Sequence, residues 1–435
     1  MKTTRLVAAL FVMTCLCAAA DAQEARRRFE TMRRIRLDKF ELVLPQAMRA
    51  NGIDMWIVAM KQNHPDPLWT DLGGGFIGAT GYFVFTDRGT RIEKAVFDID
   101  GLELEGPGGY DLVNPKEDLK TFVRERDPKR IGVNMSDDIG AADGLTYSHH
   151  QLLVKTLGEP YASRLVSAEK LVSDFRSQRV ASEVVAFGEA AQHARELAER
   201  ALSNEIITPG RTTLEDVAWW LQDRLLERGL GSSFEQPSVY VSGPKGIVAT
   251  SDATIIQPGM LMHIDWGVCL MNLCTDMKRT AYVLKAGETQ PPAGIRNAWD
   301  QALEVRRVIR ASLKPGLRGL ETLDALNKKV TEAGFAVMRE FNKPAATPAT
   351  EVVIGCHSTG NTGHGSGPSI TTWQGVQGSY PVRPGNLIAF EFFAWTPAAE
   401  WDGAKVRIPL EDDALVTERG VEWLVPVNER ILLIK

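Results

Sequence analysis

The stretch MLMHIDWGVCLMNLCTDMKRT, residues 260–280, decides the fold because it places two acidic side chains in apolar, strand-like surroundings. Acidic residues are seldom buried unless they are paired or bind a metal ion. If the stretch forms a hairpin that turns at Leu270 and Met271, Asp265 and Asp276 face each other with their Cβ atoms roughly 5 Å apart. Like charges at this distance repel, so one carboxyl group is protonated or both hold a cation. The hairpin geometry favours the cation over a pair of ordinary turn or surface aspartates.

Two glutamates and one histidine further along the chain have a similar character. Glu391 lies in the apolar stretch NLIAFEFF without a neighbouring Lys or Arg, and Glu411 lies in VRIPLEDDALV. Burial of an unpaired glutamate is costly, so these positions call for a positive partner. His364 is flanked by glycines in TGHGSG, which let a ligand approach the backbone closely. Four carboxylates and one imidazole form a donor set that suits a pair of divalent ions.

The sequence resembles the creatinase, prolidase and aminopeptidase P branch of the methionine-aminopeptidase-like ("pita-bread") metallopeptidases. The resemblance rests on four motifs. The first is the pair of aspartates eleven residues apart, with Arg-Thr shortly after the second, and the second is the Gly-His-Gly-x-Gly loop. The others are the Pro-Gly turn before the strand of Glu391 and the C-terminal EDD…VTE segment that starts at Glu411. It implies five metal ligands: Asp265, Asp276, His364, Glu391 and Glu411.

The resemblance also implies two domains and an oligomer. Residues 23–166 are similar to the α/β creatinase-like N-terminal domain, and residues 167–435 to the α+β pita-bread catalytic domain. The residue pattern agrees, because helix-like and strand-like segments alternate up to about Ser167 and strands dominate from Ser238 onward. We expect a homodimer, since in this family the N-terminal domain, often that of a partner, closes the substrate pocket.

The histidines depart from the family pattern. The family usually has a histidine about seventeen residues before the first metal aspartate, where this chain reads GIVATS, residues 246–251. A second functional histidine usually follows the ligand histidine by seven residues, where this chain has Thr371. His357 precedes His364 by seven residues instead of the usual four, which leaves open an alignment with Asn361 at the ligand position. The predicted metal ligands are present, but the surrounding acid/base groups differ.

As to function, the resemblance implies a dinuclear metal-dependent exopeptidase that hydrolyses Xaa-Pro peptide bonds, of the aminopeptidase P or prolidase type, with a hydroxide bridging the two ions. Glu391 is implied as the group that takes the proton of the attacking water. Manganese is the expected metal, and cobalt, zinc or iron suit the same donors. His263, two residues before Asp265 on the same strand face, and His357 are catalytic candidates that could replace the missing histidines.

The substrate pocket and two competing functions complete the hypotheses on the site. Trp373 and Trp395 are candidates for a pocket wall that binds a proline ring or another small apolar group, although core packing explains at least one of them equally well. A non-peptide C–N hydrolase or lyase using the same metal cradle stays open, and the missing histidines favour it. A non-catalytic binding module also stays open, but it would be expected to have lost ligands.

The first residues, 1–22, have the features of a cleaved signal peptide. Lys2 and Arg5 precede an apolar run, and Ala-Asp-Ala ends the segment. The run is too short to span a bilayer, so we expect an exported, periplasmic or secreted protein without a membrane span. Cleavage leaves three cysteines, of which at least one is unpaired, and we expect all of them to be small buried hydrophobic residues. These are Cys269, Cys274 and Cys356.

The composition is that of a large globular enzyme. The 435 residues are 44% hydrophobic and 24% charged, with 50 basic against 55 acidic side chains and a net charge of −5. These values exclude collagen-like, low-complexity and wholly disordered chains. The slight acidic excess gives no sign of the basic surface that binds nucleic acid. We therefore expect a peptide or another small molecule as the partner.

Overall fold

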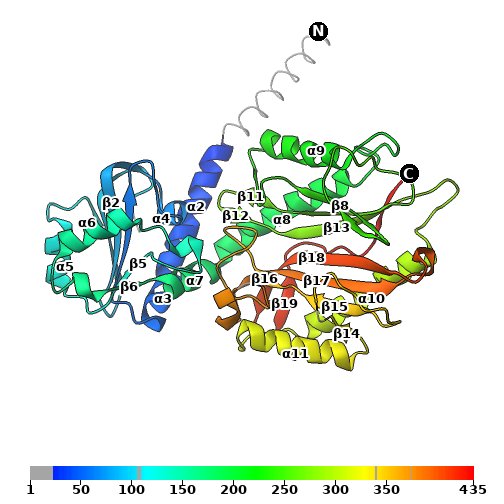
Figure 1. Ribbon diagram of the computed structural model, residues 1–435. Coiled ribbons are helices and arrows are strands. Elements are labelled where there is room, and N and C mark those ends of the chain that lie inside the picture. Colours follow the sequence, from blue (N-terminus) through cyan, green and yellow to red (C-terminus); the bar gives the residue numbers. More distant parts are fainter. Residues whose placement is uncertain (1–22, 105–108, 339, 374) are drawn as a thin grey trace, which may run out of the picture. The chain divides into compact units, whose positions relative to one another are not determined.

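The computed structural model describes residues 23–104, 109–338, 340–373 and 375–435 (Figure 1). The chain divides into two compact units. Unit 1 comprises Leu145–Leu165 and the described residues up to Val133, and unit 2 comprises Asn134–Gly144 and Val166–Lys435. The predicted signal peptide lies outside the described residues. None of the described helices combines the length and apolarity needed to cross a bilayer.

Unit 1 is built on a six-stranded mixed sheet with the strand order β4-β3-β2-β1-β5-β6. Its central strand β1 runs antiparallel to β2 and parallel to β5. Six of the seven residues of β1 are buried, as expected for a central strand that is covered on both faces. The elements are α2 (Glu24–Leu42), α3 (Leu44–Ala50), β1 (Met55–Lys61), α4 (Trp69–Leu72), β2 (Phe76–Asp87), β3 (Ile92–Asp100), β4 (Leu112–Val113), α5 (Leu119–Arg126), β5 (Ile131–Val133), α6 (Tyr147–Leu157), η2 (Ala162–Arg164) and β6 (Leu165–Ser167).

Unit 2 contains two large sheets. One has five strands in the order β20-β13-β10-β8-β9, and the other has six, with β14-β15-β17-β18-β19 in line and β16 paired to β17. A small sheet, β12-β11-β7, extends the hairpin of residues 260–280. The elements are η1 (Gly140–Ala142), α7 (Glu169–Ser177), α8 (Ala181–Ala201), α9 (Leu214–Glu227), β7 (Gly231–Ser232), β8 (Ser238–Gly243), β9 (Gly246–Val248), β10 (Leu261–Trp266), β11 (Val268–Leu270), β12 (Leu273–Cys274), β13 (Met277–Val283), α10 (Ala293–Ser312), α11 (Gly319–Glu332), β14 (Ala336–Val337), β15 (Glu351–Ile354), β16 (His357–Ser358), η3 (Gly375–Ser379), β17 (Leu387–Pro397), η4 (Ala399–Trp401), β18 (Lys405–Thr417), β19 (Gly420–Trp423) and β20 (Leu432–Ile434).

The two large sheets of unit 2 meet where β13 lies beside β18, and helices cover their outer faces (Figure 1). Helices α8 and α9 share one apolar core with the five-stranded sheet, whereas α10 and α11 share another with the six-stranded sheet. Each sheet therefore has its own core, and the polar side chains between the sheets project from two separately packed layers.

Helix α9 illustrates how the local sequence determines the elements of these layers. Thr213 caps its N-terminus: Thr213 Oγ1 accepts a hydrogen bond from the Asp216 N–H at 3.1 Å, and Asp216 Oδ2 accepts one from the Thr213 N–H at 2.8 Å. Such reciprocal caps stabilise a helix by about 1 kcal/mol. Leu214, Val217 and Leu221 follow at helical spacing and are fully buried. The helix thus begins at a defined residue and presents one apolar face to the five-stranded sheet.

The hairpin of residues 260–280 has a different register from the predicted one. Strand β10 pairs with β13 so that Asp265 faces Lys278, not Asp276. The turn lies one residue later than predicted, because Cys269 pairs with Cys274 and Leu270 with Leu273. Gly267 separates β10 from β11, and a Cβ atom there would lie 1.8 Å from the Thr275 carbonyl oxygen. Asp276 lies in the matching break of the second strand, between β12 and β13.

The expectation that all three mature cysteines are buried thiols is wrong for two of them. Cys269 and Cys274 face each other across the hairpin, with Cα atoms 4.0 Å apart, and form a disulfide. Cys356 is free and buried, as expected. The hairpin register, which the sequence analysis placed incorrectly, decides which cysteines can pair.

Candidate metal centre

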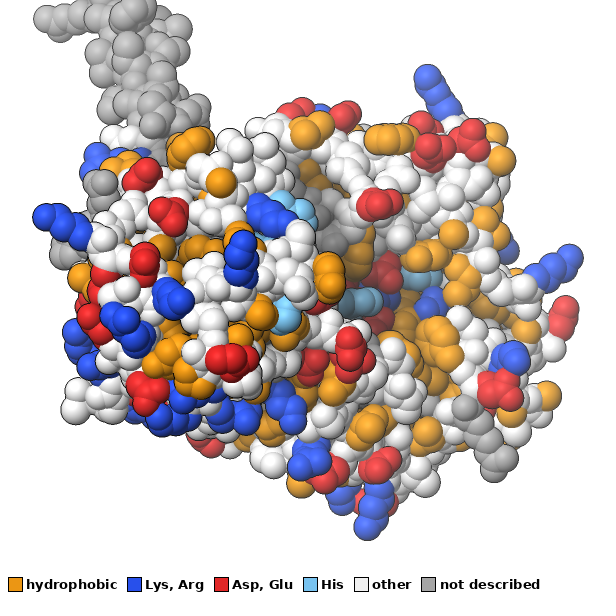
Figure 2. All heavy atoms as spheres, turned by 60° about the vertical axis from the view of Figure 1, so that its left-hand side comes forward, with side chains coloured by type: hydrophobic (Ala, Val, Ile, Leu, Met, Phe, Trp, Pro, Cys, Tyr) orange, Lys and Arg blue, Asp and Glu red, His pale blue; other side chains and the backbone are white. Residues whose placement is uncertain are grey.

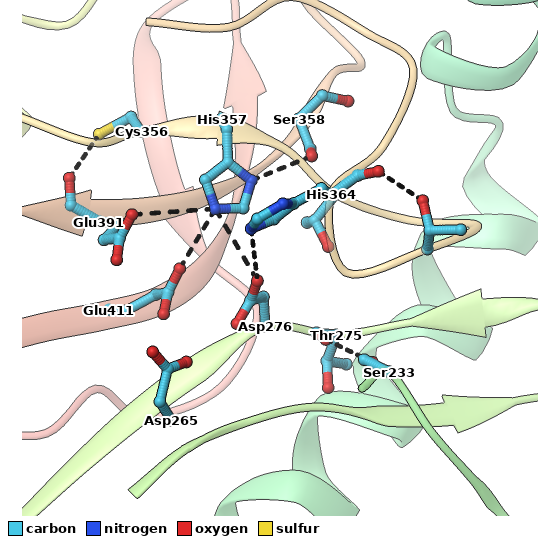
Figure 3. Close-up of polar contacts among 12 residues, drawn as sticks. Ser233, Asp265, Thr275, Asp276, Cys356, His357, Ser358, His364, Glu391 and Glu411 are labelled. Atoms are coloured by element: carbon cyan, nitrogen blue, oxygen red, sulfur yellow. Dashed lines mark hydrogen bonds and ion pairs between the residues drawn. The ribbon is translucent and has the colours of Figure 1, made fainter. Parts of the chain in front are cut away.

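The predicted carboxylates meet between the two large sheets of unit 2 (Figure 3). Asp265 comes from β10, and Asp276 comes from the break before β13. Glu391 on β17 lies directly opposite Glu411 on β18. Asp276, Glu391 and Glu411 are buried, and Asp265 is partly exposed. The structure therefore brings together all four acids that the sequence analysis selected.

His357, which the sequence analysis placed among the acid/base candidates, lies inside this cluster. Its Nε2 atom is 3.5 Å from Glu411 Oε1, 3.8 Å from Asp276 Oδ2 and 3.9 Å from Glu391 Oε2 (Figure 3). The Nδ1–H donates to the Ser358 carbonyl at 3.2 Å, which is the orientation that leaves Nε2 available as a ligand atom. Strand β16, which carries His357, is paired to β17 beside Glu391.

His364, the predicted imidazole ligand, lies at the edge of the cluster. Its side chain is exposed, and its Nε2 atom is 3.9 Å from Asp276 Oδ2. Its ring centroid is 4.5 Å from that of His357. The family spacing of seven residues, which fails between His364 and Thr371, is met between His357 and His364. Asn361 does not join the cluster, because its side chain bonds Arg179 and the Asn272 carbonyl.

Lys278 is a member of the cluster that was not predicted from the sequence. Its Nζ atom lies 2.5 Å from Glu411 Oε2, 2.6 Å from Glu391 Oε1 and 3.0 Å from Asp265 Oδ2. Burial lowers the pKa of Lys278, but the surrounding carboxylates outweigh it and hold the pKa well above its usual value. The available signal was a lysine in the middle of an apolar strand, two residues after Asp276. The predicted hairpin register placed Asp276 opposite Asp265, so it did not indicate that Lys278 faces Asp265.

The cluster contains buried carboxyl oxygens without hydrogen-bond donors. Among the described residues, no donor makes a hydrogen bond to Asp276 Oδ1 or Glu411 Oε1, although both atoms are buried. Burial and the neighbouring carboxylates hold the pKa of Asp276 well above its usual value. Burial lowers the pKa of His357, but Glu411 and Glu391 outweigh it and raise the pKa overall. A bound cation would satisfy these atoms.

Three overlapping sets of side chains could hold a metal ion. The ligand atoms of each set lie within 4.8 Å of one another. The sets are Asp276, His357 and His364; His357, Glu391 and Glu411; and Asp265, Asp276 and Glu411. The donors therefore fit a divalent ion, which carboxylate oxygens and imidazole nitrogen bind well.

Hydrogen bonds fix the segment that carries Asp276. Thr275 Oγ1 accepts the Val268 N–H at 2.8 Å, and Ser233 Oγ donates to the Thr275 carbonyl at 2.7 Å. The Asp276 N–H donates to Asp413 Oδ1 at 3.2 Å. Asp276 is therefore positioned by its neighbours and does not depend on regular strand pairing.

A cavity of about 510 Å³ opens onto the cluster. Figure 2 shows acidic and histidine side chains at the bottom of a hollow that hydrophobic side chains border. Trp373, one of the predicted substrate-binding residues, lines the cavity and is 45% exposed. Phe341 and Phe393 line it as well, with ring centroids 5.1 Å apart. The cavity thus combines an acidic floor with an aromatic wall.

Trp395 and His263 do not line this cavity. Trp395 is 3% exposed and packs with Phe393 in a small core, and it borders a separate cavity of about 860 Å³. His263 is buried, stacks on Tyr240 with ring centroids 4.8 Å apart, and lies 3.4 Å from Arg407 Nη1. Burial and the charges of Arg407 and Lys278 hold the pKa of His263 well below its usual value. It is a neutral residue behind the cavity-lining Tyr240.

With the site described, the comparisons identify the class of protein. The profile of metallopeptidase family M24 matches residues 186–418, which is more than half of the chain. The chain therefore belongs to metallopeptidase family M24, whose members use divalent metal ions. No curated protein sequence matched the chain.

Solved structures show the same fold over nearly the whole chain. The X-Pro aminopeptidase from Thermotoga maritima MSB8 is 17% identical, with a TM-score of 0.62, over 89% of this chain and 99% of its own. The Xaa-Pro dipeptidase from Bacillus anthracis is 20% identical, with a TM-score of 0.61, over 92% and 99%. The prolidase from Pyrococcus horikoshii OT3 is 19% identical, with a TM-score of 0.58, over 91% and 99%. The predicted fold, an α/β N-terminal domain and a pita-bread catalytic domain, is confirmed.

Proposed function

We propose that this metallopeptidase is an exopeptidase that hydrolyses Xaa-Pro peptide bonds. The observation that carries the proposal is the buried set of Asp276, His357, Glu391 and Glu411 at the floor of a cavity with an aromatic wall. Membership of family M24 supports metal-dependent peptide hydrolysis. The printed names of the similar structures, X-Pro aminopeptidase and Xaa-Pro dipeptidase, support proline as the residue after the cleaved bond.

The side chains of the cluster have separate tasks in this proposal. His357 Nε2 and oxygens of Asp276, Glu391 and Glu411 would hold a divalent ion. Such an ion lowers the pKa of a water molecule and polarises a carbonyl group when it is bound. Glu391 lines the cavity and is the group that accepts the proton of the attacking water. Manganese is the metal we propose first.

The groups at the cavity surface bind the substrate. His364 is exposed at the edge of the cluster and can donate a hydrogen bond to the carbonyl oxygen of the cleaved bond. The rings of Phe341 and Trp373, whose centroids are 5.5 Å apart, leave apolar surface exposed in the cavity. A proline ring would cover that surface, which favours Xaa-Pro over substrates with a small polar residue at this position.

Two features favour a second candidate function, the hydrolysis of a non-peptide C–N bond or a lyase reaction. Lys278 places an ammonium group among the acids, and the family histidine expected before Asp265 is replaced by exposed residues of β9. Both features change the electrostatics of the site. The same cavity would then accept a small substrate that is not a peptide.

A peptide panel separates these functions. The purified protein would be assayed on Xaa-Pro dipeptides and longer Xaa-Pro peptides, with Xaa-Ala peptides of equal length as the matched control. We expect Mn²⁺-dependent release of the N-terminal residue from Xaa-Pro substrates only, and loss of this activity after chelation. Metal binding without cleavage of any Xaa-Pro substrate would overturn the proposal and favour the second candidate.

We also propose that the protein is exported, with residues 1–22 removed. The disulfide between Cys269 and Cys274 supports this proposal, because structural disulfides persist in oxidising compartments. Cell fractionation with N-terminal sequencing of the extracytoplasmic protein should give a chain that begins near Gln23. A cytoplasmic protein that retains the N-terminal segment would contradict it.

A further inference from the structure

Lys278 occupies one side of the cluster as a fixed cation. Among the described residues, its Nζ atom forms ion pairs with carboxylate oxygens of Asp265, Glu391 and Glu411, at 2.5 to 3.0 Å. The ammonium group donates hydrogen bonds to Glu391 Oε1 and Glu411 Oε2 and forms an ion pair with Asp265 Oδ2. The side chain is 4% exposed and starts on β13, a strand in which every residue is buried. The ring of Phe393 lies 5.5 Å from Nζ and covers part of the ammonium group.

The oxygens of the cluster divide between Lys278 and His357. Glu391 Oε1 and Glu411 Oε2 contact Lys278, whereas Glu391 Oε2 and Glu411 Oε1 lie 3.9 Å and 3.5 Å from His357 Nε2. We call Lys278, Asp265 and the first pair of oxygens the lysine half. The histidine half consists of His357, Asp276, His364 and the second pair of oxygens. The two glutamates therefore bridge the halves, one oxygen to each side.

One unsatisfied atom, Glu411 Oε1, is the oxygen that faces His357, and the other, Asp276 Oδ1, belongs to the residue whose Oδ2 faces both histidines. Asp276 Oδ1 and Glu411 Oε1 are buried and accept no hydrogen bond from the part of the chain that the structure describes. In the lysine half, Asp265 Oδ2, Glu391 Oε1 and Glu411 Oε2 already contact the ammonium group. A divalent ion is thus needed on one side of the cluster, while the other side already holds a positive charge.

The charge of the cluster points the same way. Four carboxylates face the positive charge of Lys278 and that of Arg407, which acts electrostatically on Asp265 and Glu391. A second ion at Asp265, Asp276 and Glu411 would compete with the ammonium group for Asp265, whereas an ion in the histidine half leaves Asp265 to Lys278. Two cations that compete for the carboxyl group of Asp265 at such short range repel each other.

We infer that Lys278 takes the place of the second ion and that the centre binds a single divalent ion in the histidine half. The inference rests on the proposed function only in that the cluster binds metal. It differs from the sequence-based expectation of two ions. In this role Lys278 is a positioning residue, which holds one oxygen of each bridging glutamate and directs the other toward the ion.

Metal stoichiometry tests the inference without any substrate. The purified protein would be stripped with chelator, dialysed against excess Mn²⁺ and analysed for bound metal by mass spectrometry. We expect one equivalent for the wild type, one for Lys278→Arg and two for Lys278→Thr. Two equivalents in the wild type would overturn the inference, as would one equivalent in Lys278→Thr or the absence of bound metal in the wild type. Failure of the proposed function would appear separately, as a lack of peptide cleavage by metal-loaded protein.

A second pair of variants keeps the test decisive if Lys278→Thr does not fold. Asp265→Asn and Asp276→Asn are the same isosteric change, one in each half. We expect Asp265→Asn to retain one equivalent and a chelator-sensitive melting temperature, and Asp276→Asn to lose both. Metal loss from Asp265→Asn, or equal retention by the two variants, would contradict the division of the cluster.

Discussion

The two halves of the carboxylate cluster share Glu391 and Glu411, but the negative charge of these glutamates is balanced differently in each half. In the lysine half, the ammonium group of Lys278 lies within 3.0 Å of three carboxylate oxygens, so the charge is built into the chain. In the histidine half, buried oxygens of Asp276 and Glu411 lack donors among the described residues, and the Ser358 carbonyl orients His357 toward them. A permanent cation suits a structural role, and an incompletely satisfied set of donors suits an exchangeable ligand. The difference indicates which side of the site binds the metal.

Removing the charge that both halves share has the largest expected effect. Glu411→Gln keeps the shape of the side chain but weakens its contacts with Lys278 and His357. We expect metal binding to be lost and kcat/KM to fall by more than about 100-fold, which exceeds the usual effect of changes outside the ligand shell. The unfolding free energy should fall by about 3–5 kcal/mol, the range for breaking a buried ion pair. Metal titration and urea unfolding measure both effects, and a variant with wild-type metal affinity would break the comparison.

The two histidines sharpen the comparison within the histidine half. His357→Ala removes the inner imidazole, so we expect loss of metal and of activity together. His364→Ala removes the exposed one, so metal content should be retained while kcat/KM falls roughly 100-fold, as for the loss of one hydrogen-bonding group at the reaction centre. Metal analysis beside steady-state kinetics distinguishes them. If His364→Ala loses the metal and His357→Ala retains it, the inner and outer roles are reversed.

Trp373 should show a smaller and purely substrate-related effect. Trp373→Ala removes an exposed ring from the cavity wall without touching either half of the cluster. We expect KM for Xaa-Pro substrates to rise about tenfold, equivalent to about 1.4 kcal/mol, with kcat nearly unchanged. Trp395→Phe, in the separate small core, is the control and should leave KM unchanged. Equal effects of the two variants would remove Trp373 from the substrate pocket.

A buried histidine of unit 1 provides the contrast to His357, with an effect on stability and none on metal binding or activity. Burial, with smaller contributions from Lys61 and His64, lowers the pKa of His149 to about 4, whereas nearby acids raise that of His357. Below the unfolded pKa of about 6.5, the unfolded chain takes up a proton that folded His149 refuses. The stability of unit 1 should therefore decrease as the pH falls from about 6.5 to about 4. His149→Gln should flatten this pH dependence in thermal unfolding, and an unchanged slope would contradict the assignment.

The acids of the site were predictable because burial of charge is a local signal. Asp265, Asp276, Glu391 and Glu411 each interrupt an apolar run, and each lies in the cluster. The fold class was predictable for a related reason, since strand-like and helix-like patterns extend over many residues. These signals do not depend on which strand lies beside which.

The remaining features depend on strand register and on contacts between distant segments. A shift of two residues in the hairpin pairing placed Lys278 opposite Asp265 and allowed Cys269 and Cys274 to form a disulfide. The pairing of β16 with β17, in which His357 lies opposite Ala389, placed His357 inside the cluster and left His364 at its edge. Likewise, neighbours on adjacent strands decide that Trp395 packs in a core while Trp373 faces the cavity. Spacing along the sequence cannot provide this information.

The position of the bound ion is the most direct test of the division between the two halves. We suggest a crystal structure of the Mn²⁺-loaded protein with anomalous data collected at the manganese absorption edge. We predict one anomalous peak, bounded by His357, Asp276, Glu391 and Glu411, with the Lys278 ammonium group still in contact with Asp265. Two peaks of similar height, with the Lys278 side chain displaced from Asp265, would contradict it.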